Sequence, residues 1–224
     1  KILITGISGG HGRLLARRLL ESYEVCGVDI QDWEAAPRGI EFYRVDLRKR
    51  KFEDVIRTAM PTAIVHLGMV RHFHSGARTR HDVNVRGTQQ LLDHCIHHGV
   101  QKLVVVSSGY VYGAFPENPY NMDEDSPLSA SRSYAAIRDL VEMDALASAF
   151  LWRYPHIRTC VLRPVNTLGR SVHSLIAQYF RQHRIPTVMG FDPMLQFIHE
   201  EDVSEAIALA LEHGLQGVFN VVGP

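Results

Sequence analysis

The stretch LITGISGGHGRLLARRLL, residues 3–20, has a short apolar run, then glycines at three-residue intervals, then leucines at helical spacing. This order predicts a strand, a tight turn and an amphipathic helix. Gly6, Gly9 and Gly12 would give, in turn, the tight turn, a close approach of the backbone to a pyrophosphate, and a close contact between helix and strand. The stretch therefore predicts a dinucleotide site, and a purely structural glycine turn is the alternative.

The second apolar run, VCGVD at residues 25–29, ends in a carboxylate roughly 20 residues after the glycines, the spacing at which dinucleotide-binding folds hold the ribose. A carboxylate there accepts hydrogen bonds from both hydroxyls of the adenosine ribose and would repel a 2′-phosphate. The sequence therefore favours NAD over NADP. The alternative is that Asp29 is only a polar residue at the end of a strand.

Short β-branched runs alternate with longer segments of helical spacing. The apolar runs are KILIT (1–5), YEVCGVD (23–29), TAIVHL (62–67), KLVVVSS (102–108) and IRTCVLR (157–163). The helical segments are GRLLARRLLES (12–22), NVRGTQQLLDHCIHH (84–98) and YAAIRDLVEMDALASAF (134–150). Strands this apolar are buried on both faces, so the predicted fold class is α/β, a doubly wound parallel sheet of the Rossmann type.

The alternation becomes looser after residue 164. We expect residues 1–164 to form an NAD-binding Rossmann domain, in which a long loop at 113–133 precedes the helix that contains Tyr134. Residues 165–224 are expected to add a small substrate lobe and the last elements of the sheet. The patterns predict a helix over 173–183, a strand over 186–190, a strand and a helix within 195–212, and a last strand over 217–223.

Composition excludes several classes of function. The 24 basic and 24 acidic residues of this 224-residue chain cancel, and they form no long run of one sign, which argues against a nucleic-acid partner. No apolar run is long enough to span a membrane. Three cysteines far apart, Cys26, Cys95 and Cys160, give no disulfide framework and suit a reducing compartment, so we expect a cytoplasmic protein.

Motifs along the whole chain resemble those of the extended short-chain dehydrogenase/reductase family, in its NAD-dependent epimerase/dehydratase branch. With the glycine loop, the motifs are RVDLR (44–48), VHLGM (65–69), DVNVRGT (82–88), VVSSGYVYG (105–113), Tyr134, LRPVNTLG (162–169), FIHEEDV (197–203) and GVFNVVG (217–223). The resemblance implies NAD as cofactor and a nucleotide sugar as substrate. Since members of this family continue beyond the last motif with further helices, we expect the C-terminal substrate lobe to be incomplete.

The resemblance also implies roles for particular residues. The implied catalytic residues are Tyr134, Arg138 and Ser108. The implied substrate contacts are Ser108, Tyr110 and Asn166. The implied cofactor-binding residues are Gly6, Gly9, Gly10, His11, Gly12, Asp29, Asp46, Leu47, Leu67, Gly68, Asn84, Ser107, Tyr134, Arg138 and Pro164.

The pair Tyr134 and Arg138 departs from the family pattern, which is Tyr-x-x-x-Lys. In a helix beginning near residue 131 the two side chains would share a face, and the cation would stabilise a tyrosinate that takes a proton from substrate. Arginine keeps the charge of lysine but not its shape. The open alternatives are an ordinary surface pair, and a dinucleotide-binding module that has lost the chemistry and acts as a redox-responsive regulator or interaction domain. Tyr110 is a further departure, since relatives often have a small hydroxylated or acidic residue there, and it would reshape the sugar pocket.

Histidines and apolar helix residues leave two further questions. His94, His97 and His98 share helical spacing, but no carboxylate or cysteine stands at ligand spacing beside them in the sequence, so we expect solvated histidines and no metal site. His72, His74 and His81 fall in or near a loop expected to lie over the cofactor, and a plain loop without that contact is the alternative. By resemblance, the helices at 79–98 and 132–152 would form a four-helix bundle in a homodimer, although core burial explains their apolar residues Leu91, Leu92, Ile96, Leu140, Val141 and Leu146 equally well.

Overall fold

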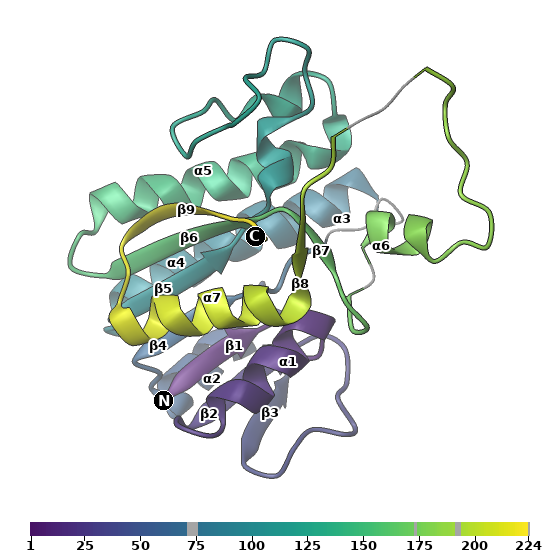
Figure 1. Ribbon diagram of the computed structural model, residues 1–224. Helices are drawn as coiled ribbons and strands as arrows, with labels where there is room; N and C mark the ends of the chain where they lie inside the picture. The colour runs from purple at the N-terminus through teal and green to yellow at the C-terminus, as the bar shows by residue number, and fades with distance from the viewer. Residues whose placement is uncertain (71–75, 173, 191–193, 224) are drawn as a thin grey trace.

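Seven parallel strands form one sheet in the order β3-β2-β1-β4-β5-β6-β9 (Figure 1). The computed structural model describes residues 1–70, 76–172, 174–190 and 194–223, so His72 and His74 lie outside the described residues. The strands are β1 (Ile2–Thr5), β2 (Val25–Asp29), β3 (Ile40–Arg44), β4 (Ala63–His66), β5 (Lys102–Val106), β6 (Arg158–Pro164) and β9 (Gly217–Val221). The chain order reverses between β1 and β4, which confirms the doubly wound parallel sheet.

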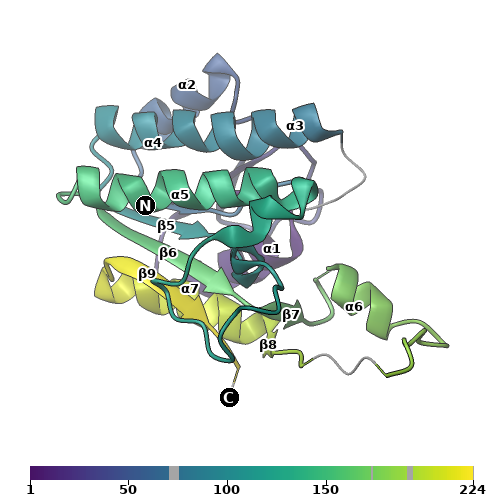
Figure 2. The same ribbon diagram turned by 90° about the horizontal axis from the view of Figure 1, so that it is seen from above.

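Helices cover both faces of the sheet. In Figure 2, α1 and α7 lie on one side, and α2, α4 and α5 lie on the other. Their bounds are α1 (Gly10–Leu19), α2 (Arg50–Ala59), α3 (Ala77–His81), α4 (Thr88–His97), α5 (Arg138–Arg153) and α7 (Glu200–His213), with a π-helix η1 (Asp82–Gly87) joining α3 to α4. Three short 3-10 helices, η2 (Gly109–Tyr112), η3 (Ser129–Arg132) and η4 (Ala135–Ile137), lie between β5 and α5.

The apolar runs are buried because each strand supplies side chains to two cores. Ile2 and Ile4 of β1 join the core under α1 and α7, whereas Leu3 joins the core under α2, α4 and α5. The same division recurs on β5, where Val104 and Leu103 face opposite helices. Burying a side chain of this size stabilises the folded state by about 1.5–3 kcal/mol. A strand covered on both faces buries every side chain, so a continuous apolar run indicates such a strand.

The C-terminal segment contributes to two sheets. β7 (Asn166–Leu168) and β8 (Phe197–His199) pair as a separate two-stranded parallel sheet, with α6 (Leu175–Phe180) between them in the chain. After α7, β9 pairs in parallel with β6 of the main sheet. The strand predicted over 186–190 is wrong, because Val188 and Met189 are exposed and this stretch pairs with no strand of the described chain.

Several expectations about surfaces and cysteines have structural outcomes. Leu91 and Leu92 are buried within the chain itself, so core burial accounts for these two residues of the suggested dimer surface. The three cysteines are buried and free. Within the described part of the chain, we find no helix with the length and apolarity needed to cross a membrane.

The buried His66 links the end of β4 to the end of β1 and to the start of α4. The His66 ring lies between two threonine hydroxyls, with Nδ1 2.8 Å from Thr5 Oγ1 and Nε2 2.8 Å from Thr88 Oγ1. Thr88 in turn donates from its hydroxyl to the carbonyl of Asn84. Burial lowers the pKa of His66 from 6.5 to about 4, because the protonated ring would lose its hydration.

The low pKa of His66 predicts a loss of stability in mild acid. Between pH 6.5 and about 4 the unfolded chain binds a proton here that the folded chain does not, so this histidine lowers the free energy of unfolding as the pH falls. The shift corresponds to about 3 kcal/mol across that window. Urea denaturation at a series of pH values should therefore give a shallower pH dependence for His66→Gln than for the unmodified protein. An equal effect from the exposed His213→Gln would contradict this assignment.

Candidate active site

The glycine loop brings three segments into close contact. Gly6 has φ of +72°, and a Cβ on it would lie 2.8 Å from the backbone of Gly68, which follows β4. A Cβ on Gly12 would lie 2.5 Å from Gly6 O, so the first turn of α1 packs directly on the loop. Gly9 is the N-cap of α1 and offers no capping side chain. The helix thus begins with bare backbone amides at the carboxyl ends of β1 and β4, the geometry that dinucleotide-binding folds present to phosphates.

Asp29 at the end of β2 lies beside this loop. Its carboxylate accepts hydrogen bonds from Ser8 N at 3.1 Å and from Gln31 N at 3.0 Å. The Ser8 hydroxyl is buried and hydrogen-bonds to no residue that the structure describes. A buried hydroxyl without a partner is costly, so the loop fits a ligand that offers a hydrogen-bonding group there.

A backbone segment from the C-terminal part of the chain covers one edge of the loop. A Cβ on Gly10 would overlap the carbonyl of Ser171, so only glycine fits at this position. Glu200, buried at the start of α7, accepts from Arg170 N at 2.9 Å and from Ser171 N at 3.0 Å. His11 is half-buried beside this contact. The backbone at Arg170 and Ser171 therefore packs against the first turn of α1.

Polar contacts hold the ends of β3 and β4. Arg48 binds the Asp46 carboxylate through Nε at 2.9 Å and Nη2 at 2.6 Å, and these bonds lower the pKa of Asp46. Leu47, between them, is buried. The amides of Leu67 and Gly68 both donate to Thr5 Oγ1. The Asp46 carboxylate is thus already engaged by a neighbouring cation, and the β4 end is fixed to β1.

Asn84, on the π-helix, anchors the backbone that follows β4. Its Oδ1 accepts from Val70 N at 2.8 Å and its Nδ2 donates to Val70 O at 3.0 Å. Ser107 is fully buried at the end of β5, and its hydroxyl finds no hydrogen-bond partner in the described chain. Pro164 ends β6, with its carbonyl facing Gly109. Ser107 is thus a second buried hydroxyl without a partner at the carboxyl edge of the sheet.

A cavity of about 510 Å³ opens where β5, β6 and β9 end. Its lining includes Ser108, Tyr110 and Asn166, which come from two separate sequence motifs. The Tyr110 hydroxyl donates to Asn166 Oδ1, and Asn166 Nδ2 donates to Gln196 O at 3.0 Å. Ser108 Oγ accepts from Tyr110 N at 3.2 Å. The three residues expected to contact substrate therefore surround one cavity.

Arg163, which lines the cavity, forms a buried ion pair that sequence reasoning did not find. Arg163 on β6 binds Asp144 of α5 through Nε at 3.0 Å and Nη2 at 2.7 Å, and both side chains are buried. Burial alone would lower the pKa of Arg163, but the hydrogen bonds and charge of Asp144 keep it above its ordinary value. Arg163 Nη1 also donates to the Tyr112 hydroxyl and to Glu124 O. The pair therefore joins the sheet, α5 and the 113–128 loop.

Asn220 on β9, which also lines the cavity, extends the hydrogen-bond network of Arg163 and Tyr112. The Tyr112 hydroxyl donates to Asn220 Oδ1 at 2.7 Å, and Asn220 Nδ2 donates to Met122 O at 3.1 Å. Asn220 N donates to Glu124 Oε1 at 2.7 Å. Tyr112 and Asn220 stand inside the motifs that carry the resemblance, so their positions were visible in the sequence. Their partners in α5 and the loop were not, because those contacts depend on packing.

Tyr134 and Arg138 do not lie on one helix face as expected. The α-helix begins at Arg138, and Tyr134 has φ of −118° and ψ of 85°, outside the helical region. The Tyr134 ring is 44% exposed and lies 6.3 Å from the ring of Phe115. Neither Tyr134 nor Arg138 is among the described residues that line the cavity. The expected helix over 131–137 is replaced by two 3-10 turns, closed by hydrogen bonds such as Ile137 N to Tyr134 O.

Known proteins similar to this chain share its architecture. Residues 2–222 match the model of a family described as "NAD dependent epimerase/dehydratase family". Protein CapI of Staphylococcus aureus is 32% identical over 93% of this chain and 68% of its own length. An uncharacterised protein of Mycobacterium bovis is 28% identical over 98% of this chain, which spans 61% of that relative's length.

Solved structures agree with the sequence matches. The UDP-glucose 4-epimerase of Thermus thermophilus, in complex with NAD, superposes with a TM-score of 0.81 at 27% identity. That alignment covers 99% of this chain and 77% of the epimerase. The dTDP-glucose 4,6-dehydratase of Bacillus anthracis also has a TM-score of 0.81, at 23% identity over 99% of this chain and 75% of its own, and supports the fold.

Proposed function

This chain belongs to the NAD-dependent epimerase/dehydratase family, and from that premise we propose that it binds NAD and acts on a nucleotide sugar as an epimerase-like or dehydratase-like oxidoreductase. The observation that carries this proposal is the cavity at the carboxyl edge of β5 and β6. Ser108, Tyr110 and Asn166 converge there, and polar groups at this edge of an open α/β sheet are where such folds bind ligands.

NAD fits the residues around the glycine loop. The buried hydroxyls of Ser8 and Ser107 both need a hydrogen-bond partner, and the bare start of α1 suits a pyrophosphate. Asp29 would accept from the ribose hydroxyls, since each carboxylate oxygen can accept more than one hydrogen bond. Bound NAD would supply a hydride acceptor for the carbon that carries the substrate hydroxyl.

The chain's own residues would manage the proton and the substrate oxygen. As tyrosinate, Tyr134 would take the proton of the substrate hydroxyl while the carbinol carbon is oxidised to a carbonyl. Ser108 would donate a hydrogen bond to that oxygen, and Arg138 would stabilise the tyrosinate and contact the nicotinamide ribose. Tyr134 lies outside the helix and is half-exposed, so this role requires its side chain to turn toward the cavity when substrate binds.

Cofactor selectivity gives a direct prediction. Calorimetry should find NAD bound at least about tenfold more tightly than NADP, a difference of about 1.4 kcal/mol. Asp29→Ala should reduce that ratio, because it removes the charge that repels a 2′-phosphate. Asp32→Ala is the matched control, since Asp32 is an exposed carboxylate three residues further on. Equal affinity for the two dinucleotides would argue against the role of Asp29.

Turnover is tested with a panel of UDP-, GDP- and dTDP-sugars in the presence of NAD, with products separated by chromatography. Conversion of one of these sugars supports the proposed function. Binding of NAD without conversion of any sugar supports a second function, a dinucleotide-binding module that serves as a redox-responsive regulator or interaction domain. The position of Tyr134 away from the cavity lining favours this alternative, as does arginine in place of the family's lysine. Conversion that appears only in Arg138→Lys would assign the loss of chemistry to that residue.

A further inference from the structure

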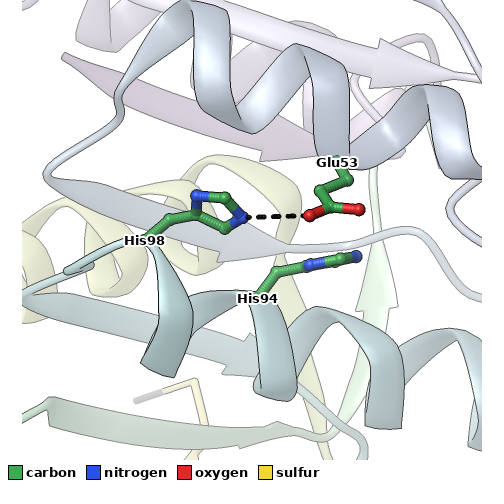
Figure 3. A group of neighbouring side chains, drawn as sticks. All are labelled: Glu53, His94 and His98. Atoms are coloured by element: carbon green, nitrogen blue, oxygen red, sulfur yellow. Dashed lines mark ion pairs between the residues drawn. The ribbon is translucent and has the colours of Figure 1, made fainter.

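Two histidines of α4 and a glutamate of α2 face one another outside the proposed active site. His94 and His98 are four residues apart at the end of α4, so their side chains share a face. Figure 3 shows Glu53, from the neighbouring α2, pointing toward them. One ligand atom from each of the three side chains lies within 4.8 Å of the others, and His98 Nε2 is 3.8 Å from Glu53 Oε1.

We propose that Glu53, His94 and His98 bind a divalent transition-metal ion, with zinc as the favoured ion, and that this ion links α2 to α4. Two imidazoles and one carboxylate are a donor set that zinc accepts, with the fourth position left for water. Tetrahedral zinc at ~2.0–2.1 Å from each donor needs donor atoms roughly 3.4 Å apart. Small side-chain rotations would bring the three groups to that separation, because Glu53 is about half-exposed and free to adjust.

The surroundings of His94 and His98 favour metal binding. His98 Nε2 is buried and makes no hydrogen bond with the described residues, although it faces the Glu53 carboxylate. The His94 ring packs edge-on against Phe52 of the core, with ring centroids 5.7 Å apart, so its direction is fixed.

The space beside the cluster allows a ligand to enter. A second cavity, of about 310 Å³, is lined by Glu53 and His94 together with Gln90 and Asp93. Asp93 brings a second negative charge to the same opening. Arg48, Lys49 and Arg50 also line it and oppose a cation, so we expect micromolar rather than nanomolar affinity. The sequence argument against a metal looked for a carboxylate along one helix, whereas Glu53 comes from a different helix.

Titration of the metal-free protein with Zn²⁺ tests the site. Calorimetry should give one bound ion per chain, with Zn²⁺ affinity at least about tenfold weaker in Glu53→Gln, His94→Gln and His98→Gln. His97→Gln and Asp54→Asn are the matched controls and should change the affinity by less than about twofold. His97 lies on the same helix with its Nδ1 near Asp93 O, and Asp54 pairs with Arg57.

Two further readouts keep the test independent of folding defects. Co²⁺ should give a visible absorption spectrum typical of tetrahedral coordination in the unmodified protein and in His97→Gln. That spectrum should be lost in Glu53→Gln, a substitution at a half-exposed side chain. Zn²⁺ should raise the melting temperature of the unmodified protein but not of Glu53→Gln. Zn²⁺ binding that is absent, or equally strong in all three ligand variants and the controls, would overturn the proposal.

Discussion

Arg163→Met is expected to lower the free energy of unfolding by about 3–5 kcal/mol, because it leaves the Asp144 carboxylate buried without its partner. The side chains of Arg163 and Asp144 are only 4% and 0% exposed, so water cannot replace the lost hydrogen bonds. Arg163 also donates to Tyr112 and to Glu124 O, so its removal should loosen the cavity lining as well. Urea denaturation followed by circular dichroism measures the loss.

A double variant and a surface pair provide the controls. Arg163→Met combined with Asp144→Leu removes both charges and should recover a large part of the lost stability, since apolar residues often replace a buried pair without penalty. Arg57→Met breaks the exposed pair with Asp54 and should cost less than about 1 kcal/mol. Equal losses in Arg163→Met and Arg57→Met would show that the buried charge is not the source of the effect.

The main sheet could be predicted because its strands are apolar on both faces. Ile2 and Ile4 of β1 enter one core and Leu3 enters the other, so every residue of β1 before Thr5 is apolar. The residues of β5 after Lys102 show the same pattern. β3 was not predicted, because it is an edge strand whose residues are half-buried or exposed. α2 was not predicted either, although its buried residues have clear helical spacing: Phe52, Val55, Ile56 and Ala59.

Two errors near the site have a common physical origin. An apolar run such as PTVMG at 186–190 indicates a strand only where another strand lies beside it, and periodicity does not reveal the neighbour. The start of α5 was predicted about two turns too early, because the Ser-, Ala- and Tyr-containing stretch before it suits a 3-10 turn as well as an α-helix. Helix boundaries of this kind depend on tertiary contacts.

Motifs identify candidate residues one at a time, but they do not identify the partners that position them. Ser108, Tyr110 and Asn166 follow from local patterns, and the topology of a parallel sheet brings them to one edge. Asp144, which pairs with Arg163, and Glu53, which faces the histidines, come from helices whose rotation about their axes is set by core packing. No spacing in the sequence encodes those two pairings.

The two tyrosines near the proposed site compete for the role of proton acceptor. Tyr110 lines the cavity, and its hydroxyl already donates to Asn166 Oδ1, while partial desolvation raises the pKa of its phenol. Tyr134 and Tyr110 are similarly exposed, at 44% and 49%, but Tyr134 precedes the cation Arg138 by four residues. This difference favours Tyr134 as the base and Tyr110 as a group that shapes the sugar pocket.

Tyr134→Phe is therefore expected to reduce kcat on the converted nucleotide sugar by about 10²–10⁴-fold, the range for loss of a general acid or base, with NAD affinity changed by less than about twofold. Tyr110→Phe should mainly alter KM, because it loses the contact with Asn166 but no proton acceptor. Tyr43→Phe, on the edge strand β3, is the control for removing a phenol hydroxyl and should leave kcat and KM unchanged. If Tyr110→Phe abolishes turnover while Tyr134→Phe retains it, the proton acceptor is Tyr110, and the proposed roles of Tyr134 and Arg138 fail together.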